Sequence, residues 1–299
     1  MSKARVVVAT RKSALALAQS RAFIARLAAR HPHVTFEELL VTTTGDVVQD
    51  RALAEIGGKG LFVKEIEEAL LDGRADLAIH SLKDVPPHLL PSLSIECIPE
   101  REDPRDALVT RSGKPLAELP PGSRIGTGSL RRRVQLLAHR PDLEIVAIRG
   151  NVDTRLRKCE TGEVDAVVLA QAGLNRLGLG ARATESLAPE VMLPAVAQGA
   201  LGIEQRADDE EVGDLLAPLS HSDTKILVSA ERGVMLAING NCTTPVAAFA
   251  LREGDRLRLR AFLAEPDGSR PRSVETTTAF PADSAEAAEI GKRLGAELR

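Results

Sequence analysis

The sequence of 299 residues contains no tryptophan, no tyrosine and only six phenylalanines. A site that stacks rings against a ligand must therefore use phenylalanine or arginine. Its three cysteines, Cys97, Cys159 and Cys242, are widely spaced and form no CxxC pair and no cluster with histidine. This pattern indicates neither a disulfide framework nor a metal site, and it favours a reducing cytoplasm.

Long apolar runs are also missing. No run approaches the roughly 18 residues that a membrane-spanning helix needs, and the beginning, "MSKARVVVATRKS", shows no export signal. We therefore expect a cytoplasmic protein without a membrane partner. The remaining composition is that of an ordinary globular protein, with 43% apolar and 27% charged residues and a net charge of −3. This length suits two or three domains of roughly 100 residues each.

Short β-branched segments alternate with helical periodicity, which indicates α/β units with parallel strands. A first unit has predicted strands at 5–10, 35–42, 76–81 and 94–99 and helices at 13–30 and 59–73. A second unit follows the charged crossover "EREDPRD", with strands at 106–111, 124–128, 144–149 and 165–170 and helices at 129–139, 151–161 and 172–178. The remainder predicts an α+β module with helices at 209–219, 223–238 and 284–298 and strands at 245–253, 256–265 and 273–280.

Positive charge is concentrated between Arg124 and Lys158, where nine Lys/Arg stand against three Asp/Glu. Several arginines fall at predicted strand-to-helix junctions, where open α/β sheets bind ligands and helix N-termini attract anions: Arg11, Arg131, Arg132, Arg149 and Arg155. We infer a ligand with several carboxylates or phosphates, which guanidinium groups bind in a bidentate manner. Alternatively, individual arginines belong to solvated helix surfaces. Nucleic acid is disfavoured by the scarcity of aromatics and the negative total charge.

Two further segments carry candidate chemistry. "HSLKDVPP" (80–87) ends a predicted strand and offers Asp84 either as a general acid/base or as a group that stabilises a cation; the alternative is a turn aspartate before proline. "NGNCTTP" (239–245) places Cys242 in a polar loop, where a thiol serves as nucleophile or attachment point; the alternative is a buried structural cysteine. "GGKGLF" fits no nucleotide-binding fingerprint and is interpreted as a lid that presents Lys59 and Phe62.

Nine blocks of the sequence together resemble one enzyme family, in the order in which that family has them. They are "ATRKSALAL", "GGKGLFVKE", "DLAIHSLKDVP", "EREDPRDA", "GTGSLRRR", "LEIVAIRGNVDTRLRK", "DAVVLAQAGLNRLGL", "LPAVAQGALGIE" and "AERGVMLAINGNC". The family is that of the porphobilinogen deaminases, also called hydroxymethylbilane synthases, and the resemblance covers essentially the whole chain. It implies a transferase of tetrapyrrole and heme biosynthesis that condenses four porphobilinogen molecules head to tail and releases ammonia each time.

The resemblance also implies a cofactor and its ligands. A dipyrromethane made from the substrate is expected on a thioether to Cys242, with Asp84 as the catalytic aspartate beside Lys83. Phe62 is expected near the pyrroles. Acetate and propionate groups of the cofactor and growing chain are expected on residues that align with the family's binding groups: Arg11, Ser13, Ser81, Lys83, Thr127, Ser129, Arg131, Arg132, Arg149, Arg155, Arg176 and Gln198. Porphobilinogen is the expected small-molecule partner of a monomeric enzyme.

The predicted fold class is α/β, with two periplasmic-binding-protein-like lobes, a cleft between them and a small C-terminal α+β domain. We expect the first lobe at 1–98 with 199–219, the arginine-rich second lobe at 99–198, and the domain that carries Cys242 at 220–299. The sequence departs from the family pattern at Glu55, Ala197 and Asn241, and it has "PVA" (245–247) where the family usually has Pro-Ile-Gly. A non-catalytic two-lobed protein that binds a polyanion is the alternative class, and a weakened paralogue is a further one.

Overall fold

The computed structural model describes residues 3–47, 63–240 and 244–299, with the side chains of 46 and 47 left out. Their contacts form two compact units. Unit 1 comprises residues 3–47, 63–101 and 200–225, and unit 2 comprises residues 102–199, 226–240 and 244–299. The predicted division into three domains, and the cleft between the lobes, stay predictions.

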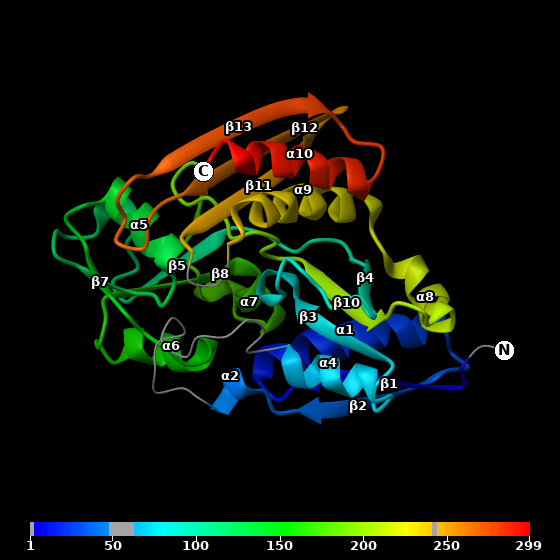
Figure 1. Cartoon of the computed structure of the whole chain (residues 1–299). Coiled ribbons are helices and arrows are strands. Elements are labelled where there is room, and N and C mark those ends of the chain that lie inside the picture. The colour runs from blue at the N-terminus through cyan, green and yellow to red at the C-terminus, as the bar shows by residue number, and fades with distance from the viewer. Residues whose placement is uncertain (1–2, 48–62, 241–243) are drawn as a thin grey trace. The chain divides into compact units, whose positions relative to one another are not determined.

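Unit 1 is built on a five-stranded sheet in the order β2-β1-β3-β10-β4 (Figure 1). The strands are β1 (Arg5–Arg11), β2 (Thr35–Val41), β3 (Leu77–Ser81), β4 (Leu93–Cys97) and β10 (Leu201–Arg206). The first three are parallel, as predicted, whereas β10 runs antiparallel to both β3 and β4. The sheet is therefore mixed, because β10 enters it from a distant part of the chain.

Helices cover both faces of this sheet. They are α1 (Ala14–Arg30), α2 (Thr44–Val47), α4 (Lys64–Leu71) and α8 (Glu210–Leu216), with the 3₁₀ helices η1 (Leu82–Asp84) and η4 (Ala217–Leu219). Val8 and Ile203 pack with α1 and α8 on one face, while Ala9 and Ala78 pack with α4 on the other. This alternation follows from the two-residue period of a strand. It places every second residue of β3 under α4.

Unit 2 contains a second five-stranded sheet, in the order β7-β6-β8-β5-β9. Its strands are β5 (Asp106–Thr110), β6 (Arg124–Gly126), β7 (Glu144–Val146), β8 (Ala166–Ala170) and β9 (Glu185–Leu187). Its helices are α5 (Leu130–His139), α6 (Val152–Glu160) and α7 (Gln171–Arg176), with the 3₁₀ helices η2 (Leu116–Glu118) and η3 (Gly180–Arg182). Strand β7 ends at Val146, earlier than predicted. The buried Ile148 that follows lies against Gly126, where an added Cβ would be 2.6 Å from Ile148 Cδ1.

The C-terminal part of unit 2 is a three-stranded antiparallel sheet with two helices (Figure 1). The elements are β11 (Val246–Glu253), β12 (Arg256–Leu263), β13 (Arg272–Ala279), α9 (Ser222–Ile238) and α10 (Ser284–Ala296). The two helices cross at glycines: a Cβ on Gly291 would lie 1.9 Å from the Ala230 carbonyl oxygen. Within unit 2, Phe249 and Phe262 of this sheet pack against Val134 of α5.

The predicted α/β class, with two sheet-and-helix lobes and a small C-terminal α+β module, is confirmed. Cys97 and Cys159 are free and buried, and burial raises the pKa of the Cys97 thiol to about 12. Within the described ranges, no helix is long and apolar enough to span a membrane.

Candidate functional site

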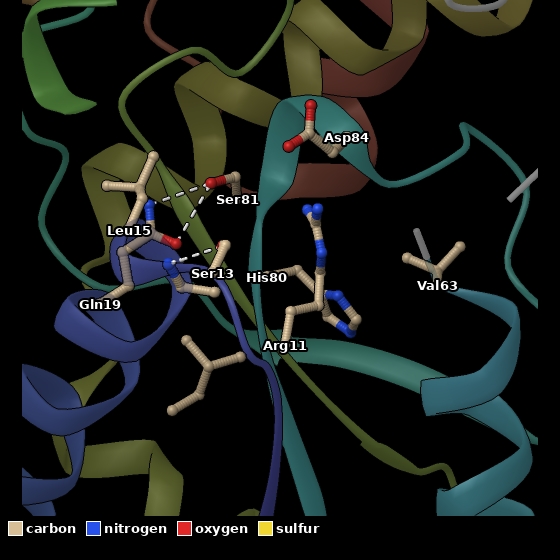
Figure 2. Close-up of a pocket in the computed structure, with 10 residues that line it drawn as sticks. Arg11, Ser13, Leu15, Gln19, Val63, His80, Ser81 and Asp84 are labelled. Carbon is tan, nitrogen blue, oxygen red and sulfur yellow. Dashed lines mark hydrogen bonds between the residues drawn. The ribbon is translucent and has the colours of Figure 1, made fainter. Parts of the chain in front are cut away.

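Four predicted residues of unit 1, Arg11, Ser13, Ser81 and Asp84, meet in a pocket at the ends of β1 and β3, whereas the predicted Lys83 does not line it. Arg11 is the last residue of β1, His80 and Ser81 end β3, and Asp84 ends η1. These four side chains line the pocket together with Ser13, at the beginning of α1. Figure 2 shows the Arg11 side chain extending from β1 toward Asp84. The carboxyl ends of parallel strands are where α/β sheets bind ligands, so the pocket lies where the sequence predicts a site.

Two local hydrogen bonds fix the α1 side of this pocket. The Ser13 hydroxyl accepts from the Ala16 amide at 3.3 Å and caps α1. The Gln19 amide donates to the Ser81 hydroxyl at 3.0 Å and ties α1 to the end of β3 (Figure 2). Ser13 and Ser81 therefore hold defined positions on either side of the pocket.

Asp84 follows directly from the end of β3. Its side chain is half-buried, as is that of Lys83. The 3₁₀ turn of η1 is closed by the Val85 amide, which donates to the Leu82 carbonyl at 3.2 Å, and Leu82 itself is buried. A buried leucine thus anchors the turn, and the carboxylate of Asp84 remains accessible from the pocket.

Beneath the pocket, His80 forms a buried pair with an acid that the sequence did not single out. Nε2 of His80 lies 2.9 Å from Oε2 of Glu204, and the two side chains are 4% and 0% exposed. Among the residues that the structure describes, Oε1 of Glu204 has no hydrogen-bond partner. Burial raises the pKa of Glu67 on α4, the charge of Glu204 adds to the rise, and His80 opposes it. Three titratable groups therefore share the α4 side of the sheet.

In unit 2, three of the predicted ligand-binding residues converge on one buried carboxylate. Asp106, at the start of β5, is fully buried. Arg131 Nη1 donates to its Oδ2 at 2.8 Å, and Arg132 Nη2 donates to its Oδ1 at 2.7 Å. The Gln198 amide donates to Oδ1 at 3.0 Å. Part of the donor capacity of these three residues therefore serves the fold.

The electrostatics of Asp106 follow from these contacts. Burial alone would raise its pKa, but the charges of Arg131 and Arg132 outweigh that effect and hold the pKa well below its usual range. Burial also lowers the pKa of Arg131, against the charge of Asp106. The cluster contains two cations for one anion, so its net charge is positive.

A second positive region surrounds Arg155 on α6. Its Nε donates to the Gly150 carbonyl at 2.8 Å. Burial, and then the charges of Arg132 and Arg149, lower the pKa of Arg155 to about 10. Since arginine seldom loses its proton, crowded arginines of this kind attract a polyanion.

The remaining predicted residues of unit 2 lie at helix ends and in one loop. Ser129 accepts from the Arg132 amide and caps α5, while the buried Thr127 hydroxyl accepts from the Ser129 amide at 3.2 Å. Arg176 Nη2 donates to the Gly199 carbonyl at 2.6 Å, and burial lowers its pKa, opposed by Glu102. Phe62 and Cys242, with Glu55 and Asn241, lie outside the described residues.

Sequence reasoning missed two acids, Asp106 and Glu204. Asp106 begins a strand that continues with the buried apolar residues Ala107, Leu108 and Val109, and Glu204 follows the buried Ile203 in β10. An acid inside such a strand is a signal by itself, because a buried carboxylate requires a partner. Which partner it has depends on pairings between strands that the sequence does not reveal.

Comparison with known proteins agrees with this arrangement. Residues 6–214 match the family model described as "Porphobilinogen deaminase, dipyromethane cofactor binding domain", and residues 225–299 match "Porphobilinogen deaminase, C-terminal domain". The porphobilinogen deaminase of Sorangium cellulosum (strain So ce56) is 62% identical over 294 residues, which are 98% of each chain. That of Chromobacterium violaceum is 50% identical over 98% of this chain and 94% of the relative.

Solved structures add little. A YaeC-family lipoprotein from Enterococcus faecalis V583 is 14% identical with a TM-score of 0.43, covering 75% of this chain and 94% of that chain. Similarity at that level carries no weight here. The two family models and the full-length relatives are decisive, and the chain belongs to the porphobilinogen deaminase family.

Proposed function

We propose that the protein condenses four porphobilinogen molecules head to tail into hydroxymethylbilane and releases one ammonia at each step. Full-length identity to enzymes with this name supports the reaction. The structural observation that carries the proposal is the pocket of unit 1, in which Asp84 lies with Arg11 and Ser13 at the ends of two parallel strands. An acid beside a cation and a hydroxyl suits a substrate that bears carboxylates and develops positive charge.

The dipyrromethane cofactor fits the groups present in unit 2. Each of its pyrroles carries an acetate and a propionate, and crowded guanidinium groups with nearby hydroxyls form the matching donor set. Burial, and then the charges of Arg132 and Arg149, lower the pKa of Arg155, and a carboxylate bound beside this cation would offset the repulsion between the arginines. We assign binding of its side chains to Thr127, Ser129, Arg131, Arg132 and Arg155.

In unit 1 we assign the cofactor contacts to Ser81, Lys83 and Asp84. We assign the covalent attachment of the cofactor to Cys242. When bound, the cofactor supplies the pyrrole end from which the chain is extended. We assign carboxylates of the substrate to Arg11, Ser13, Arg149, Arg176 and Gln198, and packing against its ring to Phe62.

Asp84 performs the central chemistry in this proposal. When ammonia leaves the aminomethyl group of porphobilinogen, the substrate ring becomes cationic. The Asp84 carboxylate stabilises that charge at the pyrrole N–H, and the half-buried pocket strengthens the interaction relative to bulk water. Arg11 and Ser13 hold the substrate's carboxylates so that the ring lies against Asp84.

The tether is tested by intact-protein mass spectrometry. We expect the purified protein to carry a mass corresponding to two pyrrole units, which Cys242→Ser loses. Cys159→Ser is the matched control, because Cys159 is buried and its variant should keep the adduct. An unmodified, active parent protein would refute the covalent primer.

The catalytic role is tested by turnover of porphobilinogen. Asp84→Asn should fold and retain substrate binding, yet turn over at least about a hundredfold more slowly. Asp72→Asn is the control, since Asp72 is an exposed acid that pairs with the exposed Arg74. Unchanged turnover in Asp84→Asn removes this residue from catalysis. Absence of turnover in the parent protein favours the polyanion-binding alternative or a weakened paralogue.

We further propose that the enzyme acts in the cytoplasm as a monomer, without nucleic acid or membrane partners. Free, buried cysteines suit a reducing compartment. Sedimentation equilibrium tests whether the protein is a monomer. An apparent mass that exceeds the mass of one chain and rises with protein concentration contradicts the proposal.

A further inference from the structure

Arg131 and Arg132 converge on Asp106 although they are adjacent residues of one helix. They lie in the first turn of α5, where consecutive side chains point about 100° apart around the helix axis and do not face each other. Nevertheless, Arg131 Nη1 lies 2.8 Å from Oδ2 of Asp106, and Arg132 Nη2 lies 2.7 Å from Oδ1. One carboxylate therefore bridges two side chains that the helix alone would direct apart.

The two guanidinium groups also repel each other. Burial lowers the pKa of Arg131, the charge of Asp106 opposes that effect, and the charge of Arg132 adds to it. Both arginines are buried, so water screens their repulsion only weakly. Without the anion between them, the two cations would move apart.

Asp106 accepts only some of the N–H groups that this pair offers. A guanidinium group has five of them. Arg131 donates one to Asp106 and one to the Leu193 carbonyl, which leaves three. Arg132 donates two to Asp106 and one to the Val168 carbonyl, which leaves two. No acceptor among the described residues takes these remaining N–H groups, so they are available to a ligand.

The pair lies at the edge of the sheet where ligands are expected. Asp106 pairs with Ala170, the last residue of β8, and β8 is parallel to β6, the strand that precedes α5. Ser129 caps the beginning of α5. The carboxyl ends of parallel strands and the N-terminus of a helix both favour an anionic ligand. The remaining N–H groups are therefore close to the place where a carboxylate would bind.

We propose that Asp106 is a positioning residue that holds Arg131 and Arg132 together as one carboxylate-binding pair. The inference deepens the proposed function and rests on its assignment of the cofactor's acetate and propionate groups to these arginines. Asp106 is fully buried, so it acts through the two guanidinium groups and does not contact the cofactor itself. It neutralises one cation and thereby weakens the attraction for anions, but the fixed geometry of the pair more than offsets that loss.

Asp106→Asn separates positioning from charge, because the two effects have opposite signs. Removal of an anion makes the site more positive, so charge alone would tighten the binding of a carboxylate. Asparagine, however, keeps one acceptor oxygen and turns an amide nitrogen, a donor, toward one of the guanidinium groups. That guanidinium group moves away from its partner, and we expect carboxylate binding to weaken about tenfold or more.

The binding assay uses full-length protein with Cys242→Ser, to which the cofactor cannot attach covalently. The probe is a dipyrromethane that bears two acetate and two propionate groups. It is titrated calorimetrically into Cys242→Ser with and without Asp106→Asn, after circular dichroism has shown that both are folded. Unchanged or tighter binding by the Asp106→Asn protein overturns the inference.

Asp165→Asn is the matched control. Asp165 is half-buried in unit 2 and also pairs with two arginines, Arg111 at 3.5 Å and Arg124 at 3.6 Å. Neither arginine is assigned to a ligand. This variant changes the net charge by the same amount as Asp106→Asn, so it should not weaken binding of the probe. An equal loss of affinity in the two variants overturns the inference.

A second comparison serves where Asp106→Asn alone does not fold. Arg132→Gln removes one of the two repelling cations, and the double variant Asp106→Asn/Arg132→Gln then contains a single arginine at the site. The double variant should bind the probe more weakly than Arg132→Gln, because Arg131 has lost its anchor at Oδ2. Equal or tighter binding by the double variant overturns the inference.

Nitrogen-15 NMR of the guanidinium groups provides a measurement that needs no ligand. Rotation about the Nε–Cζ bond should be slow for both Arg131 and Arg132 in the Cys242→Ser parent and fast for at least one of them in Asp106→Asn. Slow rotation of both in Asp106→Asn overturns the inference, whether or not the parent binds the probe. A parent in which both are fixed by Asp106 but no dipyrromethane binds instead refutes the cofactor assignment of the proposed function.

Discussion

Replacing Asp106 by asparagine tests how strongly the buried cluster of unit 2 depends on one charge. In the native protein Oδ1 accepts from Arg132 and Gln198, and Oδ2 accepts from Arg131. Asparagine has a single acceptor oxygen and no charge, so the two guanidinium groups lose their shared anion while remaining buried. Breaking a buried ion pair in this way costs about 3–5 kcal/mol of unfolding free energy.

The dependence on pH has a defined sign. The pKa of Asp106 in the folded protein lies well below its usual range, so its ionised form stabilises the fold above the unfolded pKa of about 3.9. That stabilisation is lost as the pH falls through the folded pKa. The difference in stability between the native protein and Asp106→Asn should therefore be full above about pH 5 and shrink at more acidic pH.

The assay is urea unfolding followed by far-ultraviolet circular dichroism, because the chain has no tryptophan or tyrosine for fluorescence. Hydrogen exchange of peptides from β5 and α5 locates the loss in unit 2. Asp103→Asn is the matched control: Asp103 pairs with Arg105 at 2.6 Å, with 20% and 42% of the side chains exposed, and should cost no more than about 1 kcal/mol. Equal losses in the two variants would refute the reasoning.

Two further predictions concern unit 2. Gly291→Ala should lower the unfolding free energy by about 1–3 kcal/mol, because its Cβ would lie 1.9 Å from the Ala230 carbonyl oxygen at the helix crossing; Gly213 of α8, where the Cβ would lie 3.4 Å from the flexible Gln205 side chain, is the control site, and equal losses at both contradict the packing explanation. Glu231→Gln should cost about 1–3 kcal/mol, because the buried Glu231 accepts from two backbone amides, Ala197 at 2.6 Å and Ala250 at 2.9 Å, and an amide side chain presents one acceptor. Urea unfolding measures both, and Glu231→Gln at native stability contradicts the second.

Local signals predicted most helices and strands because they act over few residues. Ser13 and Ser129 were expected to begin helices, and each caps one in the structure. Gly73 was expected to end a helix and has a φ of 69°, a conformation that glycine adopts at little cost. Local signals could not predict that β10 is antiparallel to its neighbours, because that placement depends on pairing with strands more than a hundred residues away.

The site residues also fall into two groups, those that a local sequence pattern identifies and those that depend on distant pairings. Placing Arg11, Asp84 and the basic segment of unit 2 at strand ends needed only the local α/β pattern, together with the rule that ligands bind there. The buried partners needed more: Asp106 is 25 residues from Arg131 and 92 from Gln198, and His80 is 124 from Glu204. A buried acid reveals that a partner must exist, while the sheet order selects which one. Ala197 illustrates the point, since its φ of 57° and the bond from its amide to Glu231 show a constrained backbone, whereas the sequence shows there only a departure from the family pattern.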